Sequence, residues 1–132
     1  MRIRGKQIAF LCPIVVLAVL LAIFLSMWIS TAQVMRDVKD VIYGRVDHEQ
    51  IAGTKLEHFD FTDGYPDAKV SLSMGRIFVL CGTQHGCMWV RYSYDVRSKS
   101  GDPGPAGSGI ISHWEIEKIN GKWEITDVSE HP

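Results

Sequence analysis

A long uncharged apolar run near the start of the chain limits what this protein can be. No charged residue occurs from Gln7 to Met35, and the stretch Ile8–Ile29 consists almost entirely of aliphatic and aromatic side chains. A helix rises about 1.5 Å per residue, so this stretch spans roughly 33 Å, enough to cross the hydrocarbon core of a bilayer. The sequence therefore predicts a transmembrane anchor over residues 8–30.

The flanks of the run predict its orientation. Three of the first six residues are cations, and such cations are typical of the cytoplasmic side of a membrane helix. We expect residues 1–7 to form a basic cytoplasmic tail and residues 31–132 to form a domain outside the cytoplasm. One alternative stays open. Small residues at Ser30–Ala32 suit signal peptidase, and cleavage near Ala32 would give a secreted protein.

Charge narrows the class of partner. The 132 residues include 14 Lys and Arg and 15 Asp and Glu, with a net charge of −1. Without the three N-terminal cations, the rest of the chain carries a net charge of −4. Nucleic acids and anionic lipid surfaces both require a cationic footprint, so neither is expected as a partner. The expected partners are the membrane, crossed once, and an unidentified envelope protein.

Helical periodicity continues beyond the membrane run. Val34, Val38 and Val41 recur at the spacing of one helix face, which predicts an amphipathic helix over about residues 32–46. No Pro or Gly separates this segment from the apolar run, so it is expected to continue the membrane helix and then pack on a sheet. A second short helical piece is expected within 47–51.

Strand periodicity begins at Lys69, from which apolar and polar residues alternate. The apolar run Arg76–Cys81 suits a strand buried on both faces. Alternate residues from Met88 to Val96 are apolar and are expected to form the inner face of the next strand. Residues 98–109 are rich in Gly, Pro and Ser, which predicts a flexible loop.

The last hairpin has a predictable register. Asn120 and Gly121 are the pair that a type I′ turn requires. A two-residue turn pairs residue 119 with 122, 116 with 125 and 114 with 127. One face of the hairpin then carries Trp114, Ile116, Trp123 and Ile125. A helix followed by four or five antiparallel strands predicts an α+β fold, with the helix packed on a curved sheet.

The closing segment resembles a known family. Its pattern W-x-I-x-K-x-x-G-x-W-x-I, from Trp114 to Ile125, is similar to the last hairpin of small bacterial membrane-anchored domains of the nuclear-transport-factor-2-like class, which are cystatin-like and cone-shaped. The resemblance implies a helix on a concave sheet. It extends to the order of elements over about residues 32–130, although the motif itself covers only residues 114–128.

Four aromatic residues are candidates to line a pocket between the helix and the sheet: Tyr92, Tyr94, Trp114 and Trp123. Enzymes of the cone-shaped class place Tyr, Asp and His in such a pocket. Here Asp95 has the opposite strand parity to Tyr92 and Tyr94, which separates the groups of a catalytic pair. We therefore expect no catalytic residues.

Two cysteines bracket a short loop between strands. Cys81 ends one predicted strand and Cys87 begins the next, and an oxidising location favours a disulfide between them. Free thiols remain an alternative, as does a metal site that includes His85. That spacing matches no recognised zinc pattern, and Asp60, Asp63 and Asp67 lack the spacing of a calcium loop. No metal and no cofactor is expected.

These features predict a non-catalytic, membrane-anchored extracytoplasmic domain. It would act by protein contact or weak ligand binding, as an envelope or secretion-machine scaffold. The alternative is a small-molecule binder or enzyme that uses a cone-shaped pocket between helix and sheet. An open apolar cavity would favour the alternative, and a core filled by the aromatic rings would count against it.

Overall fold

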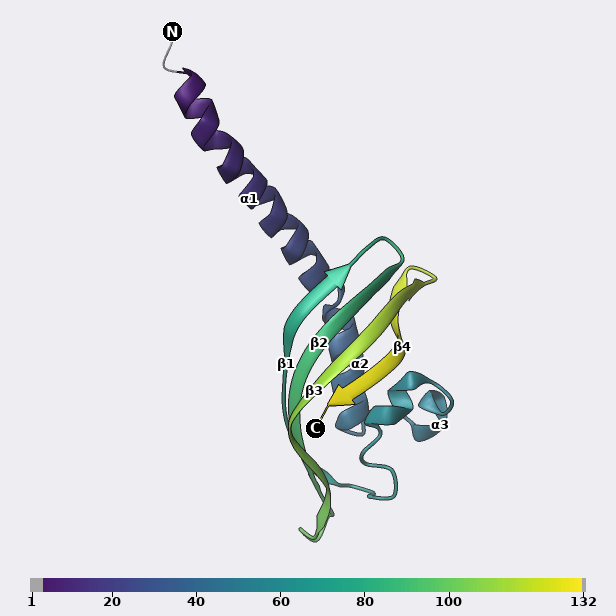
Figure 1. Cartoon of the computed structure of the whole chain (residues 1–132). Helices are drawn as coiled ribbons and strands as arrows, with labels where there is room; N and C mark the ends of the chain where they lie inside the picture. Colours follow the sequence, from purple (N-terminus) through teal and green to yellow (C-terminus); the bar gives the residue numbers. More distant parts are fainter. Residues whose placement is uncertain (1–3, 132) are drawn as a thin grey trace.

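A computed structural model describes residues 4–131 of the chain. One long helix projects from an α+β domain in which shorter helices cover one face of a curved antiparallel sheet of four strands, ordered β1-β2-β3-β4 (Figure 1). The predicted fold class is confirmed. The elements are α1 (Arg4–Ser30), α2 (Ala32–Ile42), α3 (His48–Ile51), the 3₁₀ helix η1 (Lys55–Phe59), β1 (Lys69–Cys81), β2 (His85–Arg97), β3 (Pro103–Ile119) and β4 (Lys122–His131).

α1 and α2 form one nearly continuous helix, as predicted. Thr31 alone separates them, and its carbonyl accepts hydrogen bonds from the N–H groups of Val34 and Met35. α1 is long and apolar enough to span a membrane, and most of its large side chains are exposed, except for the half-buried Phe24, Met27 and Trp28 near its end. The side chains of the predicted basic tail lie outside the described residues, apart from Gln7.

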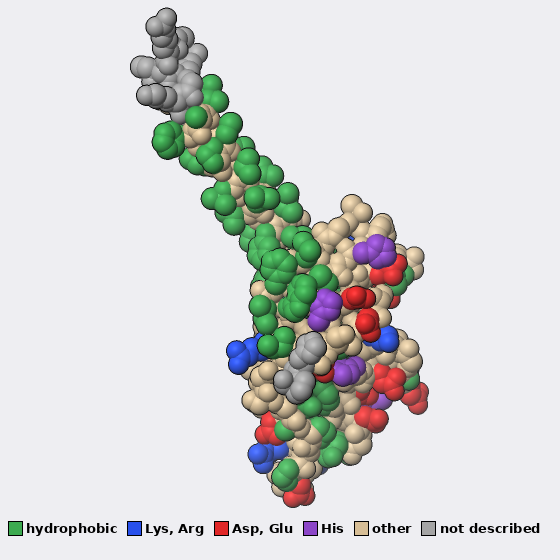
Figure 2. All heavy atoms as spheres, in the orientation of Figure 1, with side chains coloured by type: hydrophobic (Ala, Val, Ile, Leu, Met, Phe, Trp, Pro, Cys, Tyr) green, Lys and Arg blue, Asp and Glu red, His purple; other side chains and the backbone are tan. Residues whose placement is uncertain are grey.

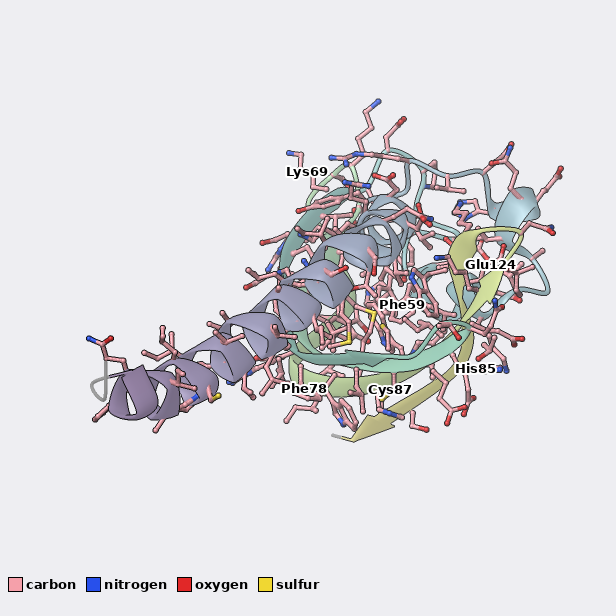
Figure 3. The ribbon with its side chains drawn as sticks, turned by 90° about the horizontal axis from the view of Figure 1, so that it is seen from above. Phe59, Lys69, Phe78, His85, Cys87 and Glu124 are labelled. Carbon is pink, nitrogen blue, oxygen red and sulfur yellow. The ribbon has the colours of Figure 1, made fainter. Side chains whose placement is uncertain are left out.

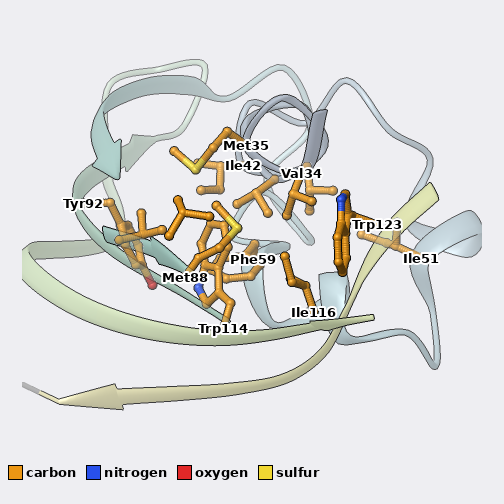
Figure 4. Close-up of a cluster of buried hydrophobic side chains, with 14 residues drawn as sticks. Val34, Met35, Ile42, Ile51, Phe59, Met88, Tyr92, Trp114, Ile116 and Trp123 are labelled. Atoms are coloured by element: carbon orange, nitrogen blue, oxygen red, sulfur yellow. The ribbon is translucent and has the colours of Figure 1, made fainter. Parts of the chain in front are cut away.

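The core lies between α2 and the concave face of the sheet. α2 turns one apolar stripe inward, and the sheet contributes large side chains from β2, β3 and β4 (Figure 4). Phe59 of η1 is fully buried at the centre, with its ring 5.3 Å from that of Trp114. α2 ends at Ile42, earlier than predicted, and Gly44 then turns the chain with a φ of +74°.

β1 is an edge strand, and the prediction that Arg76–Cys81 is buried on both faces is wrong. A bulge between Arg76 and Phe78 shifts the register with β2. Because of this extra residue, Arg76 and Val79 both lie on the inner face of the sheet, while Phe78 and Leu80 lie on its outer face. Ile77, Phe78 and Leu80 remain 54%, 44% and 54% exposed.

The loop predicted for residues 98–109 is shorter than expected, because β3 already begins at Pro103. Two register shifts let this Gly-rich segment pair with the end of β2, so that Tyr94 lies opposite Gly107. A side chain at Gly107 would lie within 2.8 Å of the Tyr94 ring. Glycine is thus used here for close packing, which composition alone does not distinguish from flexibility.

The closing hairpin follows the predicted register as far as the pair Ile116–Ile125. The predicted pair between residues 114 and 127 is wrong, since a bulge brings Val128 opposite Trp114. An extra residue in one strand reverses its alternation. The end of β4 is therefore turned over, and Glu130 lies opposite the buried Ser112 on the inner face.

Two of the strand glycines, Gly107 of β3 and Gly75 of β1, give a test of this packing. In Gly107→Ala the new methyl group would lie 2.6 Å from Ile110 Cδ1 and 2.8 Å from Tyr94 Cε1, so we expect a loss of about 1–3 kcal/mol of stability. Gly75→Ala is the matched control, because nothing lies within 4 Å of its new methyl group. Urea unfolding of the full chain in detergent measures both. Equal effects would contradict the close approach.

Candidate functional site

The four aromatic residues predicted to line a pocket come together on the inner side of the sheet. Tyr92, Trp114 and Trp123 are 1%, 0% and 5% exposed and belong to the core. Tyr94 is half-buried and stacks flat on Phe61, with 3.9 Å between ring centres. The rings fill the space between helix and sheet, so this interior is packed side chain (Figure 4).

A carboxylate missed by the sequence analysis lies at one end of this interior. The Tyr92 hydroxyl donates to Glu130 Oε2 at 2.5 Å, and His58 Nε2 contacts the other carboxylate oxygen. Burial, then the hydrogen bond to Glu130, raises the pKa of Tyr92 far above its usual value. Tyr92 is therefore a permanent proton donor, and the cluster ties β2, β4 and η1 together. Only the β4 bulge would have revealed Glu130 as an inward residue.

A small cleft of about 140 Å³ opens beside Trp123, between α2, η1 and β4. Val34, Leu56 and Ile125 give it apolar walls, and Lys122 and Asp37 lie at its rim with their charged groups 3.6 Å apart. The Trp123 indole N–H is buried and has no hydrogen-bond partner among the described residues. By contrast, the indole N–H of Trp114 donates to Ser112 Oγ at 2.7 Å.

The predicted disulfide is not formed, and the three cysteines are free thiols. Cys81 pairs with Gly86, whereas Cys87 pairs with Leu80, so the two sulfurs lie on opposite faces of the sheet. Figure 3 shows Cys87 on the side of the sheet away from Phe59. Burial raises the pKa of both thiols, with smaller contributions from the other cysteine at Cys81 and from Glu115 at Cys87.

One group of side chains has the composition of a metal site. Ligand atoms of His48, Asp60 and Asp63 lie within 4.8 Å of one another. His48 Nδ1 is 2.7 Å from Asp60, and this hydrogen bond is the main cause of a raised pKa for the imidazole. A proton on that nitrogen competes with a metal ion, so the geometry favours an ion pair between α3 and the loop after η1.

Several polar contacts join the end of α1 to β1 of the domain. Arg76 of β1 donates to the carbonyl oxygen of Trp28 and to Thr31 Oγ1, the latter at 3.1 Å. Its guanidinium also lies 4.0 Å from the centre of the Trp28 ring. Met27 Sδ accepts from the backbone N–H of Cys81 at 3.1 Å. The end of the apolar helix is thereby built into the fold of the domain.

Comparison with known proteins adds no family. No protein-family model matches the sequence, and no curated protein matches it significantly. The resemblance of the closing hairpin to the nuclear-transport-factor-2-like class thus stays a prediction. The features that bear on function are the apolar helix, its junction with the domain, the filled interior and the cleft beside Trp123.

The His48–Asp60 pair predicts a pH dependence of stability. A pKa raised in the folded state stabilises fully below the unfolded value of 6.5, and this stabilisation is lost as the pH rises through the folded pKa. His48→Asn should therefore lower the melting temperature more at about pH 5.5 than at about pH 9, by a few degrees at most because the His48 side chain is 44% exposed. His85→Asn, also exposed, is the control. A pH-independent loss in His48→Asn would contradict the ion pair.

Proposed function

We propose that the protein is a single-pass membrane protein whose domain, residues 31–132, lies outside the cytoplasm and acts by binding rather than by catalysis. The basic residues before the apolar run support this orientation. The net charge of −4 beyond them supports a protein or a neutral ligand as the partner, in an envelope or secretion scaffold.

The contacts between the end of α1 and the domain support the proposal that the anchor is retained. A signal peptide is removed, so the mature fold does not depend on it. Here Met27 and Trp28 pack against the core of the domain, and Arg76 hydrogen-bonds across the junction. Cleavage near Ala32 would cut the continuous helix and remove these contacts. The fold is therefore better suited to a permanent anchor than to a secreted product.

The interior supports binding over catalysis. Cone-shaped enzymes need a pocket between helix and sheet, and in this protein Trp114, Tyr92 and Phe59 occupy that space. Glu130 is engaged by Tyr92 and His58, so its two oxygens already have partners. The exposed surfaces and the cleft beside Trp123 are then the parts available to a partner.

Protease protection of the full chain with a C-terminal tag tests this proposal. In intact cells, external protease should remove the tag, and before digestion the protein should stay with the membrane at its full mass of 14.8 kDa plus the tag. Leu20→Lys combined with Ile23→Lys is the control, since two charges in the run should weaken insertion by several kcal/mol. A tag protected by the membrane would contradict the orientation. A released product that begins near residue 32 would contradict the anchor.

The unsatisfied indole of Trp123 supports a second candidate, a small ligand bound in the cleft. A buried donor without a partner costs about 1–3 kcal/mol, and a ligand carbonyl oxygen that reached the indole N–H through a shift of the Trp123 ring would recover this cost. The apolar walls suit a short aliphatic group, and a volume of about 140 Å³ limits its size. An N-acylated amino-acid amide, or one residue of a peptide, offers both a carbonyl oxygen and a short aliphatic group.

Indole N–H resonances distinguish this candidate. On titration of the full chain in detergent with N-acetyl-leucine amide, the Trp123 indole signal should move saturably, while that of Trp114 should stay, because Ser112 already satisfies it. Leu56→Trp, which fills the cleft from η1, should abolish the shift. Parallel movement of both signals, or none, would exclude this cleft as the binding site for the probe.

A further inference from the structure

We propose that the outer face of β1, at Ile77, Phe78 and Leu80, lies in the headgroup and acyl boundary of the bilayer that α1 crosses. The domain would then rest on the membrane through this apolar face instead of standing clear of it. This inference rests on the proposed membrane anchor. It names one occupant for the exposed apolar surface, namely the lipid.

The surface itself is the first observation. Ile77, Phe78 and Leu80 are 54%, 44% and 54% exposed on an edge strand, and the half-buried Trp89 adjoins them, with its ring centre 5.9 Å from that of Phe78. Figure 3 shows Phe78 on the side of the sheet away from Phe59. Contiguous exposed apolar groups of this kind mark an interaction surface.

The surface is continuous with α1. The Phe78 ring lies 6.2 Å from the Phe24 ring, which in turn lies 5.7 Å from Trp28. In Figure 2 the hydrophobic side chains of the helix pass onto the adjoining part of the domain without a charged group between them. Lipid in contact with the end of α1 therefore meets the face of β1 as well.

The contacts fix the depth of this face. Phe24 precedes Ile29, the end of the apolar run, by five residues, or about 7.5 Å along the helix. The run, at roughly 33 Å, scarcely exceeds a hydrocarbon core of about 30 Å, and each headgroup layer adds about 5–7 Å. A side chain at the level of Phe24 thus lies at or below the boundary between headgroups and acyl chains. The Phe78 ring centre lies within 6.2 Å of the Phe24 ring centre, so Phe78 is at or near this boundary.

Neighbouring groups suit the same boundary. Trp28 and Arg76 lie together, and both residue types are favoured where apolar and aqueous layers meet. The loop Gly82–Gln84 after β1 carries no charge. The free backbone edge of β1 requires water, which limits the strand to the boundary and keeps it out of the hydrocarbon.

Charge on the rest of the outer face favours apolar insertion over electrostatic adsorption. Glu115, Glu117 and Glu124 lie on this face of β3 and β4, two and three strands away from β1. The outer face is therefore apolar beside the end of α1, carries the cation Arg91 on β2 opposite Gly75, and is acidic on β3 and β4. An acidic surface gains nothing from anionic lipid, so the contact is expected in zwitterionic bilayers too.

Depth-dependent quenching of a fluorescent label tests the inference. The full chain, with its three cysteines changed to Ala, is reconstituted in phosphatidylcholine nanodiscs and labelled with an NBD group at one introduced cysteine. The test positions are Phe78→Cys and Leu80→Cys. Ile111→Cys is the matched control, since Ile111 is 43% exposed on the same outer face but in β3. Val16→Cys reports on the anchor itself.

Lipid with a nitroxide on acyl carbon 5 should quench the labels at the two β1 positions. This quenching should be at least about three times as strong as that of the Ile111→Cys label. The Ile111→Cys label should instead be quenched by aqueous iodide. Leu80→Cys keeps the test decisive if Phe78→Cys, whose ring packs on Phe24, fails to fold.

Each other outcome overturns the inference in a distinguishable way. Iodide quenching at both β1 positions with lipid quenching at Val16→Cys would leave the anchor intact and place the domain clear of the bilayer. Iodide quenching at Val16→Cys would remove the proposed anchor together with the inference. Labels at β1 shielded from both quenchers would assign the face to a contact with a second copy of the chain.

Discussion

The continuity of α1 and α2 across Thr31 is the constraint on which the rest of the structure depends. Thr31 is fully buried, its hydroxyl donates to the carbonyl of Met27, and Arg76 reaches it from β1. The apolar α1 therefore enters the domain as α2 without a flexible linker. Since α2 supplies the stripe that covers the sheet, the packing of the core also fixes the direction in which α1 leaves it.

Covering the sheet takes more than α2, because a helix of 11 residues is short against strands of 13 and 17. Phe59 of η1 fills the remaining centre and contacts the rings of Tyr92 and Trp114. Glu130 then closes the far end through Tyr92 and His58. The domain uses its aromatic residues to complete a core, which leaves its edges and outer face to make external contacts.

Much of the fold follows from periodicity, because burial on one face imposes a repeat that the sequence must keep. For this reason the sequence correctly predicts which residues are buried in α2, namely Val34, Val38 and Val41. It also correctly predicts the alternation of buried residues around Tyr92. Errors occur where one residue interrupts the alternation. The bulges after Arg76 and Glu115 depend on pairing between strands, which a single sequence does not reveal.

The candidate sites were less predictable for the same reason. A disulfide between Cys81 and Cys87 looked plausible from their spacing, but their strand partners place them on opposite faces. Glu130 is not among the residues predicted for a site, and it turns inward only because β4 contains an extra residue. Phe78 and Leu80 are exposed because the helices cover only one face of the sheet (Figure 1), as the exposure of Ile111 on the central strand β3 also shows. Which face is covered is a long-range property that composition leaves undetermined.

The unbroken passage from α1 to α2 also has a mechanical consequence. A transmembrane helix changes its inclination when its apolar length and the thickness of the bilayer differ. Because the helix has no flexible joint at Thr31, a change in the tilt of an anchored α1 would rotate the sheet by the same angle. One edge of the domain would then move away from the membrane surface and the opposite edge would move towards it. Bilayer thickness would then set how much of the domain faces outward, with no ligand involved.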